Sequence, residues 1–591
     1  MKIFTTTFII YLLFSLFGYS QNWETYYEKS GYKETPRYDK TVRFCRQFEN
    51  ASPMVHYTGF GVSPQGRELP LLIIDKKGNF DPAGVKASKN AVVLIQACIH
   101  AGECDGKDAG LMLIRDIVIN NKYPQLLEHV TILFIPIFNV DGHERFGEHN
   151  RINQNGPRES GWRTNAMNLN LNRDFMKADA PETRAWLSLF NEWQPDFFID
   201  CHVTDGADYQ YVLTYGLEIF GNCEPSITGW QKNRYLKEIE MRMNSSKLPI
   251  FPYIEFRNWH DPRSGIEAGV APPMLSQGYT ALRNTPGLLI ETHMLKDYKT
   301  RVNATYEMIK NTLSIISEDY ENLVKIVQQA NNDVGSASFR KTPLPVDFEL
   351  SQKDSTMVDF LGVDYTIEKS DLTGGNWFKY GTTPTTFKIP YFDRFTVKTR
   401  VDLPEAYIIP AEWKDVIERV KLHGIKTSIL ERETKFTVKS YRFKNIKYNS
   451  KSYEGRQTVE FDVDPVQEER VYQAGSVIID MNQALAKVIA YLLEPKASTS
   501  LAYWGFFNSI LEQKEYSESY VMETMAREMM KSDPALKEEF EKKKAADPKF
   551  ADSSWDMLNW FYSKSPYWDN KKDVYPVGKI FDRSVLPVVL K

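Results

Sequence analysis

The sequence predicts an α/β fold: a three-layer α/β/α sandwich with a mixed sheet, followed by a smaller β-rich region and a helical C-terminal region. Two observations predict the sandwich. Between Leu69 and Asn139, apolar runs typical of buried strands (LPLLIID, AVVLIQAC and VTILFIPIFN) alternate with the helix-like pattern GKDAGLMLIRDIVIN. Further along, the helix-like segment PETRAWLSLFNEW precedes the apolar strand PDFFIDCH, which ends at His202, and another strand, GLLIET, ends near Glu291.

The length of 591 residues exceeds the ~100–150 residues of a typical domain, so we expect two or three domains. One long amphipathic helix over residues 301–332 would close a first domain, which we place at residues 21–335. Alternating β-branched and aromatic segments, such as RFTVKTRVDL, then predict a β-rich accessory domain at 336–480. The pattern MNQALAKVIAYLL and the charged run after it predict a mainly helical region at 481–591.

The N-terminus has the features of a secretory signal peptide, which we place at residues 1–20. A single lysine precedes a mostly apolar stretch from Phe8 to Phe17, and the small residues Gly18 and Ser20 follow it. About 10 apolar residues fall short of the ~20 that span a bilayer. We therefore expect export to the periplasm or the extracellular space, with no membrane span after cleavage.

The composition excludes several classes of protein. Hydrophobic residues make up 42% of the chain and charged residues 25%, which is typical of a globular protein and argues against disorder or a fibrous repeat. The formal net charge of -4 and the lack of a long basic run indicate no nucleic-acid partner. Five cysteines, an odd number, do not form a dense disulfide framework.

Three residues at predicted strand ends form a candidate zinc site. His100 follows the strand AVVLIQACI, Glu103 lies three positions later in the turn HAGE, and His202 ends the strand DFFIDC. Open α/β sheets bind their ligands at the carboxyl ends of strands, so these side chains should meet. Two imidazoles and one carboxylate leave one zinc position open, as catalytic sites do. Zinc lowers the pKa of water and polarises a carbonyl, so the site favours amide hydrolysis.

A sulfur-containing metal site is the alternative, because Cys201 adjoins His202 and Cys98 lies two residues before His100. In a strand, Cys201 faces away from His202, whereas Cys98 shares the face of His100. We favour the interpretation that both cysteines are small buried strand residues.

Two further elements complete the candidate site. Glu291 ends an apolar strand that would raise its pKa, as a general base requires; the alternative is an acidic residue that caps the next loop. In LNLNRDF, Asn172 and Arg173 offer an amide beside a guanidinium fork that matches a carboxylate. Such a pair could recognise the C-terminal carboxylate of a peptide.

Taken together, HAGE, LNLNRDF, APETRAW, DFFIDCH and GLLIET resemble, in order and approximate spacing, the zinc carboxypeptidase family typified by carboxypeptidase A. The resemblance covers roughly residues 25–335, and the rest resembles the C-terminal extension of larger bacterial members. It implies one zinc ion per chain, a general base and acid, and a pair that holds the terminal carboxylate. By this resemblance, His100, Glu103 and His202 would bind the zinc ion, and Glu291 would be the general base and acid. Asn172 and Arg173 would hold the terminal carboxylate.

The resemblance also implies an arginine that stabilises the developing oxyanion and a tyrosine that closes over the substrate. Arg163 in GWRTN is the preferred arginine, with Arg158 as its rival. Tyr279 in SQGYTALRNT is the candidate tyrosine, although it lies nearer to the glutamate than in the family; Tyr253 is a second candidate, and a packing role is the alternative.

The sequence therefore predicts an exported zinc metallocarboxypeptidase that acts on peptides or proteins with a free C-terminus. One alternative is a zinc amidase that acts on cell-wall peptides or other amide conjugates. Another is an inactive peptide-binding module, against which the presence of every expected ligand argues.

Overall fold

The computed structural model describes residues 22–586, so the predicted signal peptide at 1–20 lies outside the described residues. The chain forms two compact units. Among the described residues, the first contains residues 22–330 and 348–396, and the second contains residues 331–347 and 397–586. The first unit carries all of the predicted site residues.

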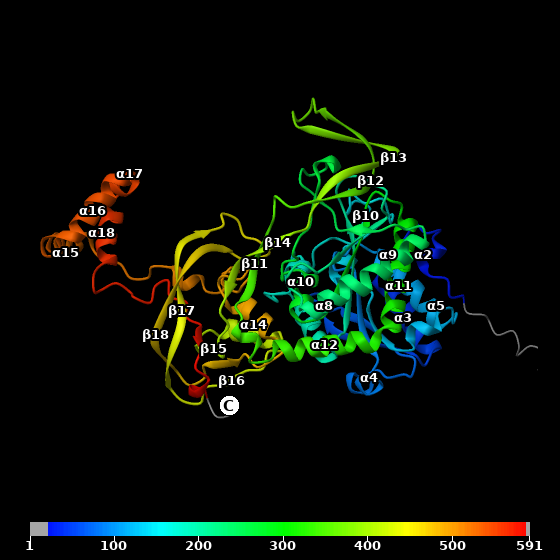
Figure 1. The fold of residues 1–591 in the computed structure, drawn as a ribbon, viewed down its shortest axis with the longest axis horizontal. Coiled ribbons are helices and arrows are strands. Elements are labelled where there is room, and N and C mark those ends of the chain that lie inside the picture. Colours follow the sequence, from blue (N-terminus) through cyan, green and yellow to red (C-terminus); the bar gives the residue numbers. More distant parts are fainter. Residues whose placement is uncertain (1–21, 587–591) are drawn as a thin grey trace, which may run out of the picture. The chain divides into compact units, whose positions relative to one another are not determined.

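A mixed sheet of eight strands organises the described part of the first unit (Figure 1). In spatial order the strands are β1 (Val55–Val62), β2 (Glu68–Ile74), β4 (Val130–Ile135), β3 (Ala91–Ala97), β5 (Phe197–Thr204), β10 (Gly287–His293), β6 (Leu213–Leu217) and β7 (Phe251–Pro252). The central strands β4, β3, β5 and β10 run parallel, whereas β2 and β6 pair antiparallel with their neighbours. The predicted mixed sheet is confirmed.

Alternate residues of β5 face two different layers of helices, as the two-residue period of a strand requires. On one face, a Cβ added at Gly106 would lie 2.3 Å from Cβ of Cys201, so a helix packs directly on this strand. On the other face, the ring of Phe198 meets Trp186 edge to face, at 5.8 Å between centroids. The first layer contains α5 (Asp105–Val118), α9 (Leu236–Ser245) and α11 (Tyr298–Glu318), and the second contains α7 (Pro181–Trp193) and α10 (Ser276–Leu282).

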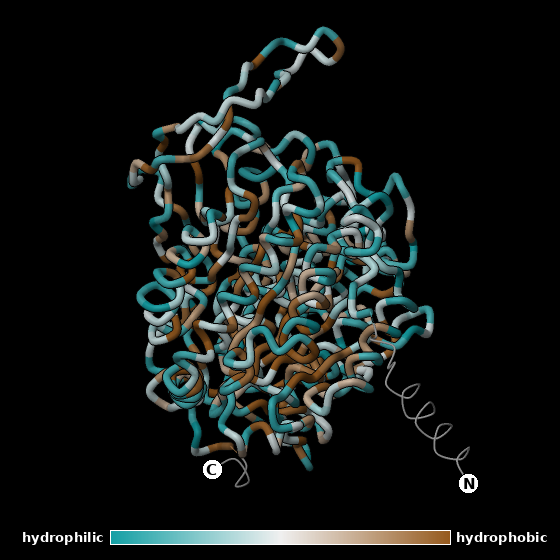
Figure 2. Tube along the Cα trace, turned by 90° about the vertical axis from the view of Figure 1, so that its right-hand side faces the viewer, coloured by the Kyte–Doolittle hydropathy of each residue, from teal (hydrophilic) through white to brown (hydrophobic). Residues whose placement is uncertain are grey.

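The three-layer α/β/α sandwich is thereby confirmed. Apolar segments concentrate in the interior and hydrophilic segments lie towards the surface (Figure 2). The other α-helices of the described first unit are short or peripheral: α2 (Tyr26–Lys29), α3 (Tyr38–Ala51), α4 (Pro82–Ser88), α6 (Val140–Glu144) and α8 (Pro225–Trp230).

The long helix predicted over residues 301–332 is interrupted. Helix α11 ends at Glu318, and α12 (Tyr320–Val334) begins after Asp319. The carboxylate of Asp319 accepts a hydrogen bond of 2.7 Å from the indole N–H of Trp230. This contact comes from a distant part of the chain, so the helical periodicity of the sequence does not reveal it.

A second sheet, of four strands, also belongs to the first unit, although two of its strands lie beyond the predicted end of the first domain at residue 335. Its order is β12 (Thr356–Lys369), β13 (Asn376–Phe392), β9 (Ile266–Glu267) and β8 (Glu255–Phe256). The hairpin of β12 and β13 falls within the predicted accessory domain at 336–480, but β13 pairs in parallel with β9 of the first unit. This long-range pairing places residues 348–396 with the first unit.

The second unit contains a six-stranded sheet within the described residues. Its strands, in spatial order, are β16 (Ser428–Ile429), β19 (Val477–Asp480), β15 (Ala406–Ile409), β20 (Gly578–Ile580), β17 (Thr434–Tyr448) and β18 (Val459–Tyr472). A two-stranded sheet joins β11 (Leu344–Leu350) to β14 (Phe395–Val401). The α-helices are α13 (Lys414–Leu422), α14 (Ala486–Leu493), α15 (Ser519–Ser532), α16 (Pro534–Ala546), α17 (Pro548–Ala551) and α18 (Ser554–Ser563). The predicted helical region at 481–591 also supplies β20 to this sheet.

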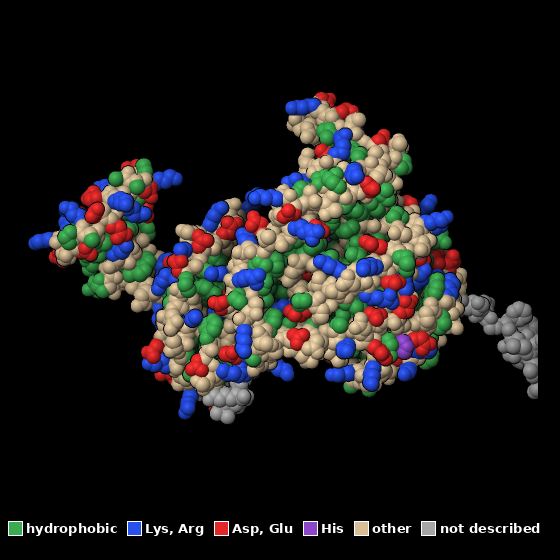
Figure 3. All heavy atoms as spheres, in the orientation of Figure 1, with side chains coloured by type: hydrophobic (Ala, Val, Ile, Leu, Met, Phe, Trp, Pro, Cys, Tyr) green, Lys and Arg blue, Asp and Glu red, His purple; other side chains and the backbone are tan. Residues whose placement is uncertain are grey.

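Between residues 22 and 586, no helix is both long enough and apolar enough to cross a membrane. On the face shown in Figure 3, lysine and arginine side chains are interspersed with aspartate and glutamate, in keeping with the small net charge.

Candidate active site

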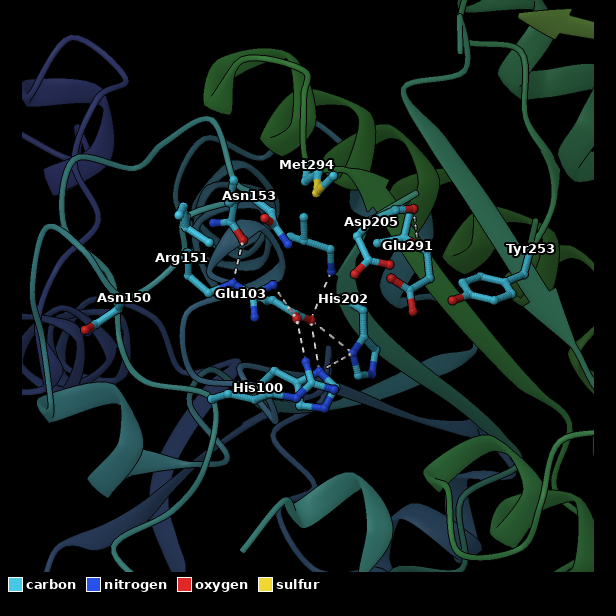
Figure 4. Close-up of a pocket in the computed structure, with 15 residues that line it drawn as sticks. His100, Glu103, Asn150, Arg151, Asn153, His202, Asp205, Tyr253, Glu291 and Met294 are labelled. Carbon is cyan, nitrogen blue, oxygen red and sulfur yellow. Dashed lines mark hydrogen bonds and ion pairs between the residues drawn. The ribbon is translucent and has the colours of Figure 1, made fainter. Parts of the chain in front are cut away.

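The three predicted metal donors lie together at the carboxyl ends of β3 and β5 (Figure 4). Nδ1 of His100 lies 3.2 Å from Oε2 of Glu103, and Nδ1 of His202 lies 3.1 Å from the same oxygen. The two Nδ1 atoms are 3.2 Å apart. All three residues are buried. Parallel neighbouring strands bring these donors from distant parts of the sequence to one edge of the sheet.

This triangle of donor atoms fits a zinc ion. Two ligand atoms that each lie about 2.1 Å from a tetrahedral ion are about 3.4 Å apart, close to the three distances in this site. Burial lowers the pKa of His100 to about 4, so its ring is neutral at physiological pH, the form that binds a metal. Residues His100, Glu103 and His202 would therefore hold the ion and leave one coordination position for water or substrate.

Two polar residues that the sequence interpretation did not identify hold the histidine rings. Nε2 of His202 faces Oδ2 of Asp200 at 3.0 Å, and Nε2 of His100 faces Oδ1 of Asn170 at 3.2 Å. Burial raises the pKa of Asp200, but His202 outweighs this effect and holds that pKa below its ordinary value. Partners of this kind fix the orientation of metal-binding histidines. The position of Asp200, two residues before His202 on one strand face, was an available signal.

Glu103 has a third charged neighbour, Arg151, which the sequence interpretation also missed. Nη2 of Arg151 donates a hydrogen bond of 2.8 Å to Oε1 of Glu103. Burial opposes ionisation of Glu103, but His100 and Arg151 outweigh it and hold the pKa well below its usual value. Arg151 lies in an irregular loop without a local motif, so no sequence signal marks it.

Glu291 lies beside the metal donors, because β10 pairs with β5 in a register that sets Glu291 opposite His202. Its carboxyl group lines a cleft of about 310 Å³ together with the three donors (Figure 4). Burial raises the pKa of Glu291 to about 8, and the carboxylates of Glu103 and Asp200 add to this shift while His202 opposes it. A divalent cation at the donors would lower that pKa.

The two candidate arginines occupy different environments. Arg163 lines the cleft, and its Nη1 lies 3.6 Å from Oε1 of Glu103. Arg158 instead pairs with Glu34, with 2.9 Å from Nη1 to Oε1, and its side chain is 62% exposed. The geometry therefore favours Arg163 over Arg158 as the cation beside the metal donors.

Asn172 and Arg173 line a larger cavity of about 700 Å³, which also contains His100, His202 and Glu291. Oδ1 of Asn172 accepts a hydrogen bond of 2.9 Å from the backbone N–H of Ser276. Nη1 of Arg173 donates to the carbonyl oxygen of Asn172 at 2.7 Å. Because the amide oxygen of Asn172 is already bonded, its NH₂ group is the part that can bind a ligand.

Tyr279, the candidate lid tyrosine, does not line either cavity. Its side chain is fully buried, its ring packs 6.1 Å from Trp186, and its hydroxyl lies 3.2 Å from Nη1 of Arg283. Helix α10 turns this residue towards α7, so the prediction of a substrate contact is corrected here. Tyr253, the second candidate, lines both cavities and is 38% exposed, and its hydroxyl points towards Glu291 (Figure 4).

Neither cysteine beside the histidines joins the donor set. Cys201 faces α5, on the other side of β5 from His202. Cys98 lies instead near Cys104 and His143, and the ligand atoms of these three residues are within 4.8 Å of one another.

Part of the chain is similar to known carboxypeptidases. Residues 41–246 match the family model described as zinc carboxypeptidase. Carboxypeptidase 2 of Trichophyton rubrum is 22% identical over 491 residues, which cover 80% of this chain and 84% of that protein. Carboxypeptidase 2 of Trichophyton equinum has the same identity and coverage.

Among solved structures, a metallo-carboxypeptidase from Pseudomonas aeruginosa in complex with (2-guanidinoethylmercapto)succinic acid is 19% identical, with a TM-score of 0.35, and covers 48% of this chain and 69% of that chain. Carboxypeptidase A from Helicoverpa armigera is 17% identical, with a TM-score of 0.35, and covers 49% and 75%. The region matched by the family model contains His100, Glu103 and His202 but ends before Glu291. With a match to the zinc carboxypeptidase model at residues 41–246, the chain carries a zinc carboxypeptidase domain and is a zinc-dependent peptidase.

Proposed function

We propose that this chain is an exported metallocarboxypeptidase that hydrolyses the C-terminal peptide bond of peptides or proteins. One observation carries the proposal: the metal donors His100 and His202, the carboxyl group of Glu291 and the pair Asn172 and Arg173 all line one cavity of about 700 Å³. A carboxylate-binding pair in the same cavity as a hydrolytic centre favours substrates that end in a free carboxylate.

One zinc ion, held by His100, Glu103 and His202, would polarise the scissile carbonyl and lower the pKa of a water molecule. Glu291 accepts the proton of the attacking water and passes it to the leaving amine. Burial raises the pKa of Glu291, whereas a bound divalent cation would lower it. Arg163 supplies positive charge where the oxyanion develops.

Asn172 and Arg173 set the position of the substrate. The NH₂ group of Asn172 and the guanidinium group of Arg173 donate hydrogen bonds to the terminal carboxylate. Holding this carboxylate at a fixed distance from Glu291 selects the last peptide bond for cleavage. Tyr253, rather than Tyr279, is the tyrosine that contacts the substrate, because its ring lines the cavity.

Peptides with a free or an amidated C-terminus test the proposal. The zinc-loaded protein should release the last residue from the free peptide and cleave the amidated peptide at least about 100-fold more slowly. Arg173→Met should raise KM for the free peptide and remove most of this preference, since it removes the charged hydrogen bonds. Arg158→Met, which changes an exposed arginine that pairs with Glu34, is the matched control.

Equal cleavage of the amidated peptide, unchanged in Arg173→Met, would exclude a carboxypeptidase and favour the zinc amidase. Export is tested separately: the N-terminal sequence of the protein recovered from the periplasm or the medium should begin near residue 21.

A further inference from the structure

Gln277 is a buried amide in the cavity that contains the metal donors. It is the second residue of α10, and it lines the cavity although only 8% of its surface is exposed. Among residues 22–586, its side chain has no hydrogen-bond partner, so both halves of the amide are available to a ligand. An amide that faces a cavity without a protein partner can donate to and accept from a molecule bound there.

The position of Gln277 follows from two paired strands. Gly216 of β6 lies opposite Leu289 of β10. A Cβ added at Gly216 would lie 3.0 Å from Oε1 of Gln277 and 3.1 Å from Cβ of Leu289, so the amide lies directly over this pair. Leu289 and Glu291 are two residues apart on one strand face, a spacing of about 7 Å. The amide of Gln277 therefore lies about the length of one large side chain from Glu291, the proposed general base.

Ser276 fixes this position relative to the rest of the site. Its backbone N–H donates to Oδ1 of Asn172 at 2.9 Å, and its hydroxyl donates to Oδ2 of Asp200 at 2.5 Å. The start of α10 is thus bonded both to the carboxylate-binding pair and to the residue that orients His202. Gln277 follows directly, which makes its distance from both groups a fixed property of the fold.

Away from the metal donors and Glu291, the charged residues of the cavity wall are at least partly exposed or already paired. Nε of Arg257 lies 3.2 Å from Oε1 of Glu267, and the hydroxyl of Tyr215 donates to Oε1 of Glu240 at 3.0 Å. Lys232 and Glu255 lie in exposed positions, and Oδ1 of the half-buried Asp393 lies 3.5 Å from Nε of Arg394. The exposed wall of the cavity as a whole is mostly apolar, with Leu217, Ala268, Val270 and Leu289 among its residues.

We propose that Gln277 selects the side chain of the residue that is released: a large uncharged side chain with a polar end, with tyrosine preferred over phenylalanine. This inference rests on the proposed carboxypeptidase function. An amide can donate to and accept from a phenolic hydroxyl, and the apolar wall accommodates the ring. A charged side chain would lose its hydration for a neutral partner, which is unfavourable.

Peptides that differ only in a C-terminal Tyr, Phe, Gln or Lys test the proposal through kcat/KM. The wild-type protein should favour Tyr over Phe by about tenfold, as expected when a buried polar group is left without its partner. Gln277→Met, which keeps the length of the side chain but not its hydrogen bonds, should bring the ratio close to one, mainly by lowering kcat/KM for the Tyr peptide. Gln328→Met, at an exposed position of α12, should leave the ratio unchanged.

Gln277→Glu provides a gain-of-function test that a merely destabilised variant could not pass. Its carboxylate should raise kcat/KM for the Lys peptide relative to Tyr, because it supplies the missing opposite charge. The proposal is overturned if the wild type cleaves Tyr and Phe peptides equally, or if both Gln277 variants keep the wild-type preferences. If the wild type prefers the Lys peptide and Gln277→Met keeps this preference, the exposed carboxylates of the cavity wall determine selectivity and Gln277 does not.

These outcomes are distinct from failure of the proposed function. If the zinc-loaded wild type releases no residue from any free peptide, the carboxypeptidase proposal itself is wrong. If it releases residues without the predicted preference, only the role of Gln277 is wrong.

Discussion

Oδ2 of Asp200 lies 3.0 Å from Nε2 of His202, whereas Nδ1 of the same ring faces Oε2 of Glu103 at 3.1 Å. The carboxylate of Asp200 is itself held by the hydroxyl of Ser276 and by Nε2 of Gln96, at 2.5 and 3.0 Å. This chain of contacts fixes the ring and makes it a stronger ligand.

Asp200→Asn should lower the affinity for zinc by about 10- to 100-fold while the protein stays folded. The amide keeps the shape of the side chain but loses the charge that supports the ring. Competition with a chelator of known affinity measures the effect. Asp39→Asn, at an exposed position of α3, is the control, and equal zinc affinity in the two variants would contradict the role given to Asp200.

Removal of the metal should abolish hydrolysis, and zinc should restore it. We expect one zinc ion per chain by elemental analysis, bound by His100, Glu103 and His202. His202→Ala should lose the bound zinc, whereas His129→Ala, at an exposed position, should keep it. Full zinc content in His202→Ala would show that the ion binds elsewhere.

Glu291→Gln should retain zinc and lower kcat by about 1,000-fold, within the range that general acid–base catalysis supplies. The amide cannot accept the proton of the attacking water, although it fills the same space opposite His202. Steady-state kinetics and elemental analysis of the same preparation measure the two properties. Activity near the wild-type level would leave Glu291 with the alternative role of capping a loop.

Exchange of each candidate tyrosine for phenylalanine should separate their roles. Tyr253→Phe should lower kcat/KM by about tenfold, since one hydrogen bond to the substrate is lost in a partly exposed cavity. Tyr279→Phe should affect thermal stability rather than catalysis, because this ring is buried against Trp186. The reverse pattern would restore Tyr279 as the substrate contact.

The buried carboxyl group of Glu218 should make stability depend on pH. Burial raises its pKa from 4.5 to about 7, so the folded state keeps a proton that the unfolded state has lost between these values. Stability should therefore fall as the pH rises from about 5 to 8, by up to roughly 3 kcal/mol from this group.

Glu218→Gln, which cannot ionise, should lose that part of the pH dependence, and its stability relative to the wild type should increase with pH. Thermal unfolding midpoints at pH 5 and pH 8 measure it, with Glu192→Gln at an exposed position as the control. Other buried carboxyl groups with a pKa of about 7, at Asp108, Glu182 and Asp196, remain in every variant. Identical pH profiles for the two variants would contradict the prediction.

Much of the site was predictable because it lies at the ends of apolar strands. The runs before His100, His202 and Glu291 identify buried parallel strands, whose carboxyl ends must share one edge of the sheet. The carboxylate-binding role of Asn172 and Arg173 was likewise predictable from the chemistry of two adjacent side chains in one short motif. These features depend on residues within a few positions of each other, and the sequence displays them directly.

The tertiary structure decided what depends on distant contacts. Pairing of β13 with β9 assigned residues 348–396 to the first unit, and the packing of α10 against α7 turned Tyr279 away from the cavity. Arg151 and Gln277 carry no local signal, because each acquires its role only where a separate segment places it beside Glu103 or over Gly216. The sequence alone thus determined the sheet and indicated the candidate metal donors, since both follow from periodicity and strand ends. The residues that surround the substrate required the fold, since no short-range pattern encodes which loops meet.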